Sequence, residues 1–184
     1  MGSDAAIQTI SEKAGLVGTV VQEMSGAKDA AAYAVDLMKD RALTTMTCPG
    51  LANEARDRVV EACAAHGMEL VDPPLRDHMD RLDLALTWVD AGIADTGTLV
   101  LRSDSEDIRI ATMMSRIHVA MLPVSKIRET AMDMAGELDA ILKSDTASYT
   151  AFITGPSRTA DIERVLAIGV HGPVELHLLL IKEA

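Results

Sequence analysis

The residues best suited to chemistry gather near the C-terminal end of the sequence. After the apolar run that ends at Ile153 come two turn-forming residues and then hydroxyl, guanidinium and carboxylate groups, in the order Gly155, Pro156, Ser157, Arg158, Thr159 and Asp161. A guanidinium pairs with a carboxylate or phosphate through a forked hydrogen bond, and free N–H groups at a helix start attract anions. We therefore predict a small-anion site, with helix capping as the competing role of the hydroxyl and carboxylate residues.

Two further segments are candidates for the same site. His171 and Gly172 follow a short apolar run, and the imidazole is suited either to carrying protons near neutral pH or to a structural role in a turn. Earlier in the chain, hydroxyls and a flexible backbone come together in the segment Asp95, Thr96, Gly97 and Thr98. The competing interpretation is that Gly97 only permits a tight turn into the next strand. If the fold brought Asp95 and Asp161 together, they would form an acid–base pair.

Several catalytic classes have no support in the sequence. It contains no dinucleotide-binding G-x-G-x-x-G between a strand and a helix, no phosphate-binding G-x-x-x-x-G-K-[ST] and no nucleophile-elbow G-x-S-x-G. Its two cysteines, Cys48 and Cys63, are too few to hold an iron–sulfur cluster. We expect Cys63 in the core, Cys48 in an exposed loop before Pro49, and no bound metal. His118 and His177 lie within apolar runs, so we expect both to be buried and hydrogen-bonded. No catalytic residue is assigned.

Composition narrows the class of protein further. The formal net charge is −11, so nucleic acid is an unsuitable partner. No apolar run is long enough to span a membrane and no secretory signal is visible, so we expect a cytoplasmic protein. Residues are 48% hydrophobic but only 2% aromatic. The core must therefore consist of aliphatic side chains, with most of the eleven methionines in it.

Apolar periodicity supplies the elements that would position these groups. Helical spacing from Ala5 to Met24 predicts an N-terminal helix, assigned to residues 1–27, packed on a single domain of residues 28–184. Within that domain we predict a helix at 28–39, with Ala31, Val35 and Met38 facing inward. We then predict strands at 42–47 and 68–71 around a helix at 51–65 that Gly67 ends, which implies a parallel pair. We also predict a helical turn within 90–97, a helix at 126–142 capped by Ser125, and a helix from the anion-site residues through Leu166. The fold class is α/β, a mainly parallel sheet with helices on both faces.

Two motifs carry a resemblance to a known family. The segment GPSRTADIERVLAIGVHGP (155–173) resembles the signature of the LUD domain family, in particular its lactate utilisation protein C branch, and GIADTGTLVL (92–101) resembles a second signature of that family. The closing segment ELHLLLI (175–181) agrees in order and spacing. The resemblance implies the fold shared by ribose-5-phosphate isomerases, glucosamine-6-phosphate deaminases and CoA transferases (NagB/RpiA/CoA transferase-like).

The resemblance also implies a function. It makes the chain a subunit of a cytoplasmic lactate-oxidising system that acts with iron–sulfur partner proteins. The clusters would belong to those partners, with no cofactor bound by this chain, which would bind a small carboxylate or phosphate or organise the complex. The alternative is a stand-alone enzyme of the same fold that acts on a phosphorylated or carboxylated metabolite at Thr96, Ser157 and Arg158. A third possibility is an assembly module with no ligand.

Overall fold

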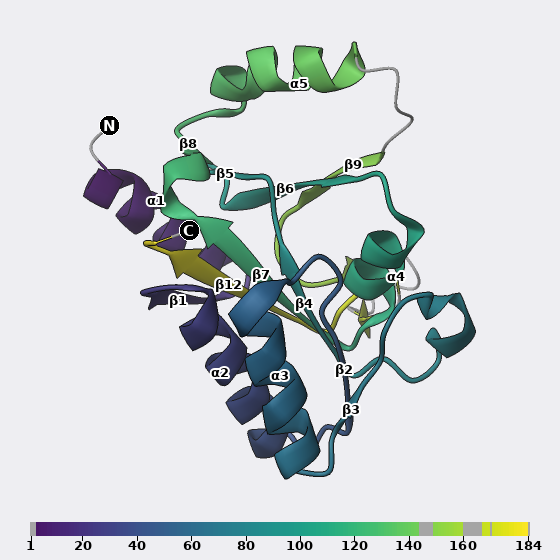
Figure 1. Cartoon of the computed structure of the whole chain (residues 1–184). Coiled ribbons are helices and arrows are strands. Elements are labelled where there is room, and N and C mark those ends of the chain that lie inside the picture. The colour runs from purple at the N-terminus through teal and green to yellow at the C-terminus, as the bar shows by residue number, and fades with distance from the viewer. Residues whose placement is uncertain (1–2, 144–148, 160–166, 170, 184) are drawn as a thin grey trace.

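The computed structural model describes residues 3–143, 149–159, 167–169 and 171–183, and its centre is a parallel sheet (Figure 1). Within that part of the chain the sheet has six strands, ordered β1 (Val20–Met24), β12 (Glu175–Ile181), β7 (Ile117–Pro123), β4 (Leu84–Trp88), β2 (Thr45–Thr47) and β3 (Glu69–Leu70). Every neighbouring pair is parallel. The predicted α/β class and the parallel pairing of β2 with β3 are confirmed.

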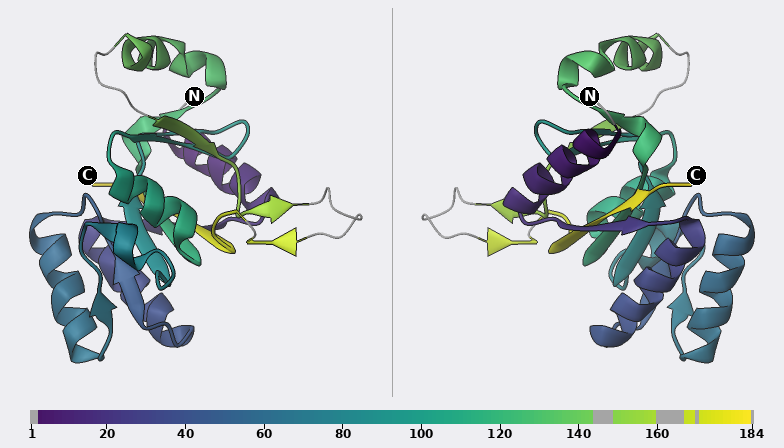
Figure 2. Two further views of the ribbon diagram at one scale, coloured as in Figure 1. Left: turned by 90° about the vertical axis from the view of Figure 1, so that its right-hand side faces the viewer. Right: turned by 90° about the vertical axis from the view of Figure 1, so that its left-hand side faces the viewer.

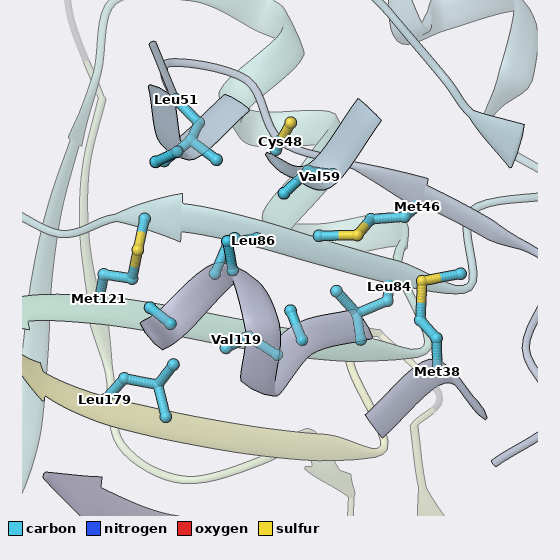
Figure 3. Packing of buried hydrophobic residues seen from close by; sticks show 14 of the residues in the cluster. Met38, Met46, Cys48, Leu51, Val59, Leu84, Leu86, Val119, Met121 and Leu179 are labelled. Carbon is cyan, nitrogen blue, oxygen red and sulfur yellow. The ribbon is translucent and has the colours of Figure 1, made fainter. Parts of the chain in front are cut away.

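Alternation of side chains along the central strands divides the core between the two faces of this sheet. Val119 and Met121 point to the face covered by α2 (Ala27–Asp40) and α3 (Asn53–Ala65), where Figure 3 shows their packing. Ala120 and Leu122 point to the opposite face, covered in part by α1 (Ser3–Leu16). Helix α4 (Glu106–Met114) packs beside Ala85, which points away from the α2–α3 face. The prediction of helices on both faces is confirmed.

A second sheet lies over the α1 face of the main sheet. Its order is β8 (Ile127–Arg128), β5 (Ala91–Ile93), β6 (Thr98–Ser103) and β9 (Tyr149–Ile153), and β6 is antiparallel to both of its neighbours. Leu99 and Leu101 of β6 pack toward the main sheet, whereas Val100 packs on Met134. Met134 closes the short helix η3 (Ala131–Met134), which leads into α5 (Ala135–Leu142). Figure 2 shows α5 at the end of the molecule opposite α2 and α3.

The predicted N-terminal helix is too long. It ends at Leu16, and Gly18 then adopts a left-handed φ of +86° that a helix cannot contain. Residues 20–24, assigned to that helix, form the edge strand β1 instead, with Val20 beside His177. The helical spacing continued by chance through a segment whose paired β-branched residues, Val20 and Val21, favour a strand.

Two more predicted helices are wrong. The segment 90–97 holds β5 and a turn, not a helical turn. The segment 126–142 is divided into a short helix η2 (Val124–Lys126), β8, η3 and α5. A reciprocal capping box explains where the later helical segment begins, because the Thr130 hydroxyl and backbone N–H both bond Asp133 Oδ2, at 2.9 and 2.8 Å. The starting signal is therefore Thr130, not Ser125.

The sulfur-containing side chains mostly belong to the core. Of the ten described methionines, Met38, Met46, Met121 and Met134 are buried and Met24 and Met68 pack against the core edge. The other four, Met79, Met113, Met114 and Met132, are exposed, so the expectation of a largely buried set is met only in part. Cys63 is buried as predicted, but Cys48 is also buried, which corrects its expected exposure. Burial raises the pKa of the Cys48 thiol to about 11, so it is protonated at neutral pH. Among the described helices, none has the length and apolar character that crossing a membrane requires.

Candidate anion-binding cavity

A cavity of about 530 Å³ lies between the two sheets, beside α4 and β9. Its lining includes His118 and Leu176, which are neighbours in register and each the second residue of its strand. The cavity therefore lies at the amino ends of β7 and β12. The loop 154–157 follows β9, which belongs to the second sheet and not to the parallel sheet.

The first turn of this loop packs closely on the turn after α1. Gly155 has a φ of +78°, and a Cβ placed there would lie 2.7 Å from the carbonyl oxygen of Val17. Gly18, in the same turn, leaves room for the guanidinium of Arg158, which would collide with any Cβ at that position. The absence of side chains at Gly18 and Gly155 thus lets the loop and the Arg158 head group sit against the N-terminal segment.

Ser157 ties the two arms of the loop together. Its backbone N–H donates to the carbonyl of Pro173 at 2.8 Å, and its carbonyl accepts from the Gly169 N–H at 3.0 Å. Its hydroxyl accepts a hydrogen bond from the His171 N–H at 3.3 Å. The hydroxyl therefore joins two distant segments of the loop, and the predicted helix-capping role for Ser157 is wrong.

The predicted helix does not start at this loop. Arg158–Thr159 form β10, which pairs antiparallel with β11 (Ala167–Ile168). Residues 160–166, including Asp161, lie outside the described residues. The rest of the predicted helix, with the capping role offered to Asp161, therefore stays a prediction.

Two arginines line the cavity, Arg109 and Arg158, and the guanidinium of Arg158 also lies beside Gly18. The carbon Cζ of Arg109 lies 5.1 Å from the centre of the Tyr149 ring, a cation–π distance. Neither guanidinium has an acidic partner among the described residues. Carboxylates pair with Arg41, Arg56, Arg76, Arg81, Arg116 and Arg128, whereas Arg58 and Arg102, like the two cavity arginines, form no ion pair within the described residues. Neither Arg58 nor Arg102 lines this cavity. In a chain with a net charge of −11, two cations without carboxylate partners on one cavity leave charge for an anionic ligand.

His118 contributes a polar group to the wall of the cavity. Its side chain is fully buried, as the sequence suggested, and Nε2 lies 2.9 Å from the hydroxyl of Thr87. The other ring nitrogen, Nδ1, is buried without a hydrogen-bond partner in the described structure. An unpartnered buried polar atom costs roughly 1–3 kcal/mol. Burial also lowers the pKa of His118 to about 4, so the ring is neutral at pH 7.

This depressed pKa predicts a stability that depends on pH. The unfolded state takes up a proton at His118 near pH 6.5, whereas the folded state resists it down to about pH 4, so stability falls as pH drops through that window. Between pH 7 and pH 5 the expected loss from this residue is about 2 kcal/mol. Urea unfolding at both pH values should show this loss in the wild type and a smaller one in His118→Gln. Equal losses in the two proteins would contradict a lowered pKa at His118. Burial also lowers the pKa of His177, but this residue is present in both proteins and contributes equally to both losses.

The predicted site residues separate into two groups. Gly155, Pro156, Ser157, Arg158, His171 and Gly172 all line the cavity. The hydroxyl of Thr98 lies just behind it, 2.8 Å from that of Thr154, a lining residue. Asp95 and Thr96 are instead exposed in the turn after β5 and do not reach the cavity. Gly97 lies in the turn before β6 and packs against the backbone of α1, as the turn interpretation expects.

Sequence reasoning missed the residues that α4 and β9 contribute. Arg109, Thr112 and Met113 line the cavity from one face of α4, with spacings of three and four residues, and Tyr149 and Phe152 line it from β9. The helical spacing was visible, but nothing in it indicated which cavity the helix would face. His118 was identified only as a buried histidine.

Comparison with known proteins identifies the family. The sequence model of the LUD domain matches residues 7–181. The chain belongs to the LUD domain family. It is 36% identical over 104 residues to the Lactate utilization protein C of Anoxybacillus flavithermus, a match that covers 56% of this chain and 46% of that protein. The protein of the same name from Bacillus licheniformis is 28% identical over 154 residues, covering 80% of this chain and 60% of that protein.

The LUD chain also resembles a solved structure along its whole length. A crystal structure of a DUF162 family protein from Deinococcus radiodurans superposes with a TM-score of 0.69 and 18% sequence identity, covering 98% of this chain and 99% of that chain. At this identity the likeness establishes the fold alone. The LUD chain spans about half the length of the curated relatives that it matches.

Proposed function

We propose that this LUD-domain chain is the anion-binding subunit of a lactate-utilisation system that works with iron–sulfur partner proteins. The iron–sulfur clusters are assigned to the partners, since both cysteines of this chain are buried. The single observation that carries anion binding is the pair of guanidinium groups, Arg109 and Arg158, without carboxylate partners in the described structure, on one cavity. The names of the curated relatives support the connection with lactate.

The anion-binding part is tested by removing one cation. Arg158→Ala is expected to weaken binding of lactate or inorganic phosphate about tenfold, because a hydrogen bond to a charged group is lost. Isothermal titration calorimetry measures the affinity, and ligand-induced thermal shifts provide a second reading. Arg58→Ala is the matched control, since Arg58 is also exposed but lies on α3, away from the cavity. Equal affinities in wild type and Arg158→Ala would refute the anion site.

The partner part requires a different experiment. Purification of the chain from cells grown on lactate, under gentle low-salt conditions, should recover cysteine-rich, iron-containing proteins together with lactate-dependent dye reduction. Recovery of the chain alone would instead favour a stand-alone enzyme acting on a carboxylated or phosphorylated metabolite.

A further inference from the structure

The cavity is larger than lactate, the acid in the names of the related proteins, would need. Lactate has six non-hydrogen atoms and would fill roughly 180 Å³ if each took the 30 Å³ of a liquid water molecule. The cavity offers about 530 Å³, within the range of sites that hold larger organic ligands. About two thirds of it would remain for a further part of a ligand.

The walls around that remaining space are largely apolar. Leu101 and Leu176 line the inner part, and Met113 and Phe152 line the outer part. Both outer side chains are markedly exposed, 58% for Met113 and 52% for Phe152. Large exposed apolar side chains that converge on one cavity commonly mark a ligand or partner surface.

Ten of the twenty lining residues have polar side chains, and among these Arg109, Arg158 and His118 carry nitrogen groups suited to an acidic ligand. The guanidinium groups come from α4 and from the β10 end of the loop, whereas Nδ1 of His118 comes from β7 in the main sheet. Because Nε2 is engaged by Thr87, Nδ1 is the ring nitrogen that is buried without a hydrogen-bond partner in the described structure. Depending on the tautomer, it offers either a lone pair or an N–H.

These features together define a ligand class. We propose that the cavity binds a 2-hydroxy or 2-oxo acid with a large apolar side chain, its carboxylate on Arg158 and Arg109, its apolar body against Phe152, Met113 and Leu176, and its 2-oxygen hydrogen-bonded to His118 Nδ1. The proposal rests on the anion site proposed above and specifies its ligand. It assigns His118 as a binding residue.

Three probe ligands, used in calorimetric titrations of the full chain, separate the contributions of the carboxylate, the apolar body and the 2-oxygen to binding. They are lactate, 3-phenyllactate, and 3-phenylpropanoate, which has the ring and carboxylate but no hydroxyl. We expect 3-phenyllactate to bind the wild type at least about tenfold more tightly than lactate. In His118→Gln, whose carboxamide retains a partner for Thr87, binding of 3-phenyllactate should weaken about tenfold and that of 3-phenylpropanoate should be unchanged. Thr87→Ser, which keeps the hydroxyl, is the control and should bind like the wild type.

The outcomes distinguish this inference from the proposed function. If lactate or phosphate binds through Arg158 and 3-phenyllactate binds no more tightly than lactate, the anion site stands and the larger ligand is refuted. If 3-phenyllactate binds tightly but His118→Gln weakens both phenyl ligands equally, the role of Nδ1 is refuted. If no anion binds, the proposed function and this inference both fail. Circular dichroism of each variant excludes unfolding as the cause of a loss.

Discussion

Replacing Gly97 by alanine is expected to lower the free energy of unfolding by about 3 kcal/mol, the sum of backbone strain and overpacking. Gly97 has a φ of +64°, where an L side chain is strained. A Cβ there would also lie 2.6 Å from the carbonyl carbon of Lys13 and 2.7 Å from Cα of Ala14. These are backbone atoms of α1, so the clash is relieved only by moving the helix. Urea unfolding measures the change.

Gly67→Ala is the matched control for this substitution. Gly67 has nearly the same φ, +66°, but nothing lies within 4 Å of a Cβ built there. Gly67→Ala should therefore lower the free energy of unfolding by only about 1 kcal/mol, the cost of the left-handed backbone. Equal losses in the two variants would show that α1 does not press on Gly97. Unchanged stability with lost phosphate binding in Gly97→Ala would restore the ligand role that the sequence suggested for this turn.

Leu86→Ala is expected to cost about 3 kcal/mol, within the usual range for truncating a buried leucine. Leu86 is fully buried in β4, at the middle of the cluster in Figure 3, and packs among side chains from the main sheet, α2 and α3. Truncation leaves a cavity that strands hydrogen-bonded on both sides are poorly able to close. The unfolding free energy from urea titration at pH 7 provides the test.

Leu142→Ala is the control for the core substitution. Leu142 ends α5 and is 84% exposed, so its removal should change the unfolding free energy by less than about 0.5 kcal/mol. A loss at Leu86 no greater than that at Leu142 would contradict the packing described here. A large loss at Leu142 alone would place an interaction on α5 that the fold of the single chain does not contain.

Local signals in the sequence predicted the α2–α3 half of the fold well. The apolar positions Ala31, Val35 and Met38 gave the helix that became α2, and Gly67 correctly marked the end of α3 with its left-handed φ of +66°. The short loops around α3 then required β2 and β3 to be parallel, as they are. The two helices are each determined within about fifteen residues of chain, the range over which periodicity and turn chemistry act. The β2–β3 pairing follows from the one strand–helix–strand unit of residues 45–70.

The remaining errors arose where partners distant in sequence decide the structure. The strand character of residues 20–24 depends on pairing with β12, and the position of the loop after Ile153 depends on β9 joining β6 in a separate sheet. The residue pattern of a strand does not indicate which other strand it will pair with. Arg109 and His118 lie nine residues apart but come from α4 and β7, and only the packing of β9 alongside makes them line the same cavity.

The position of β12 between β1 and β7 also has a consequence for biosynthesis. Strand β1, which begins at Val20, and one edge of β7, which begins at Ile117, both pair with residues 175–181. The main sheet therefore stays incomplete until this segment has emerged from the ribosome. Sheets closed by such long-range pairings fold slowly, since a large loop must be ordered first. Until then the nascent chain exposes an open edge of β7, a strand buried at six of its seven positions in the finished protein. That edge is a template for aggregation and therefore the natural point for chaperones to act.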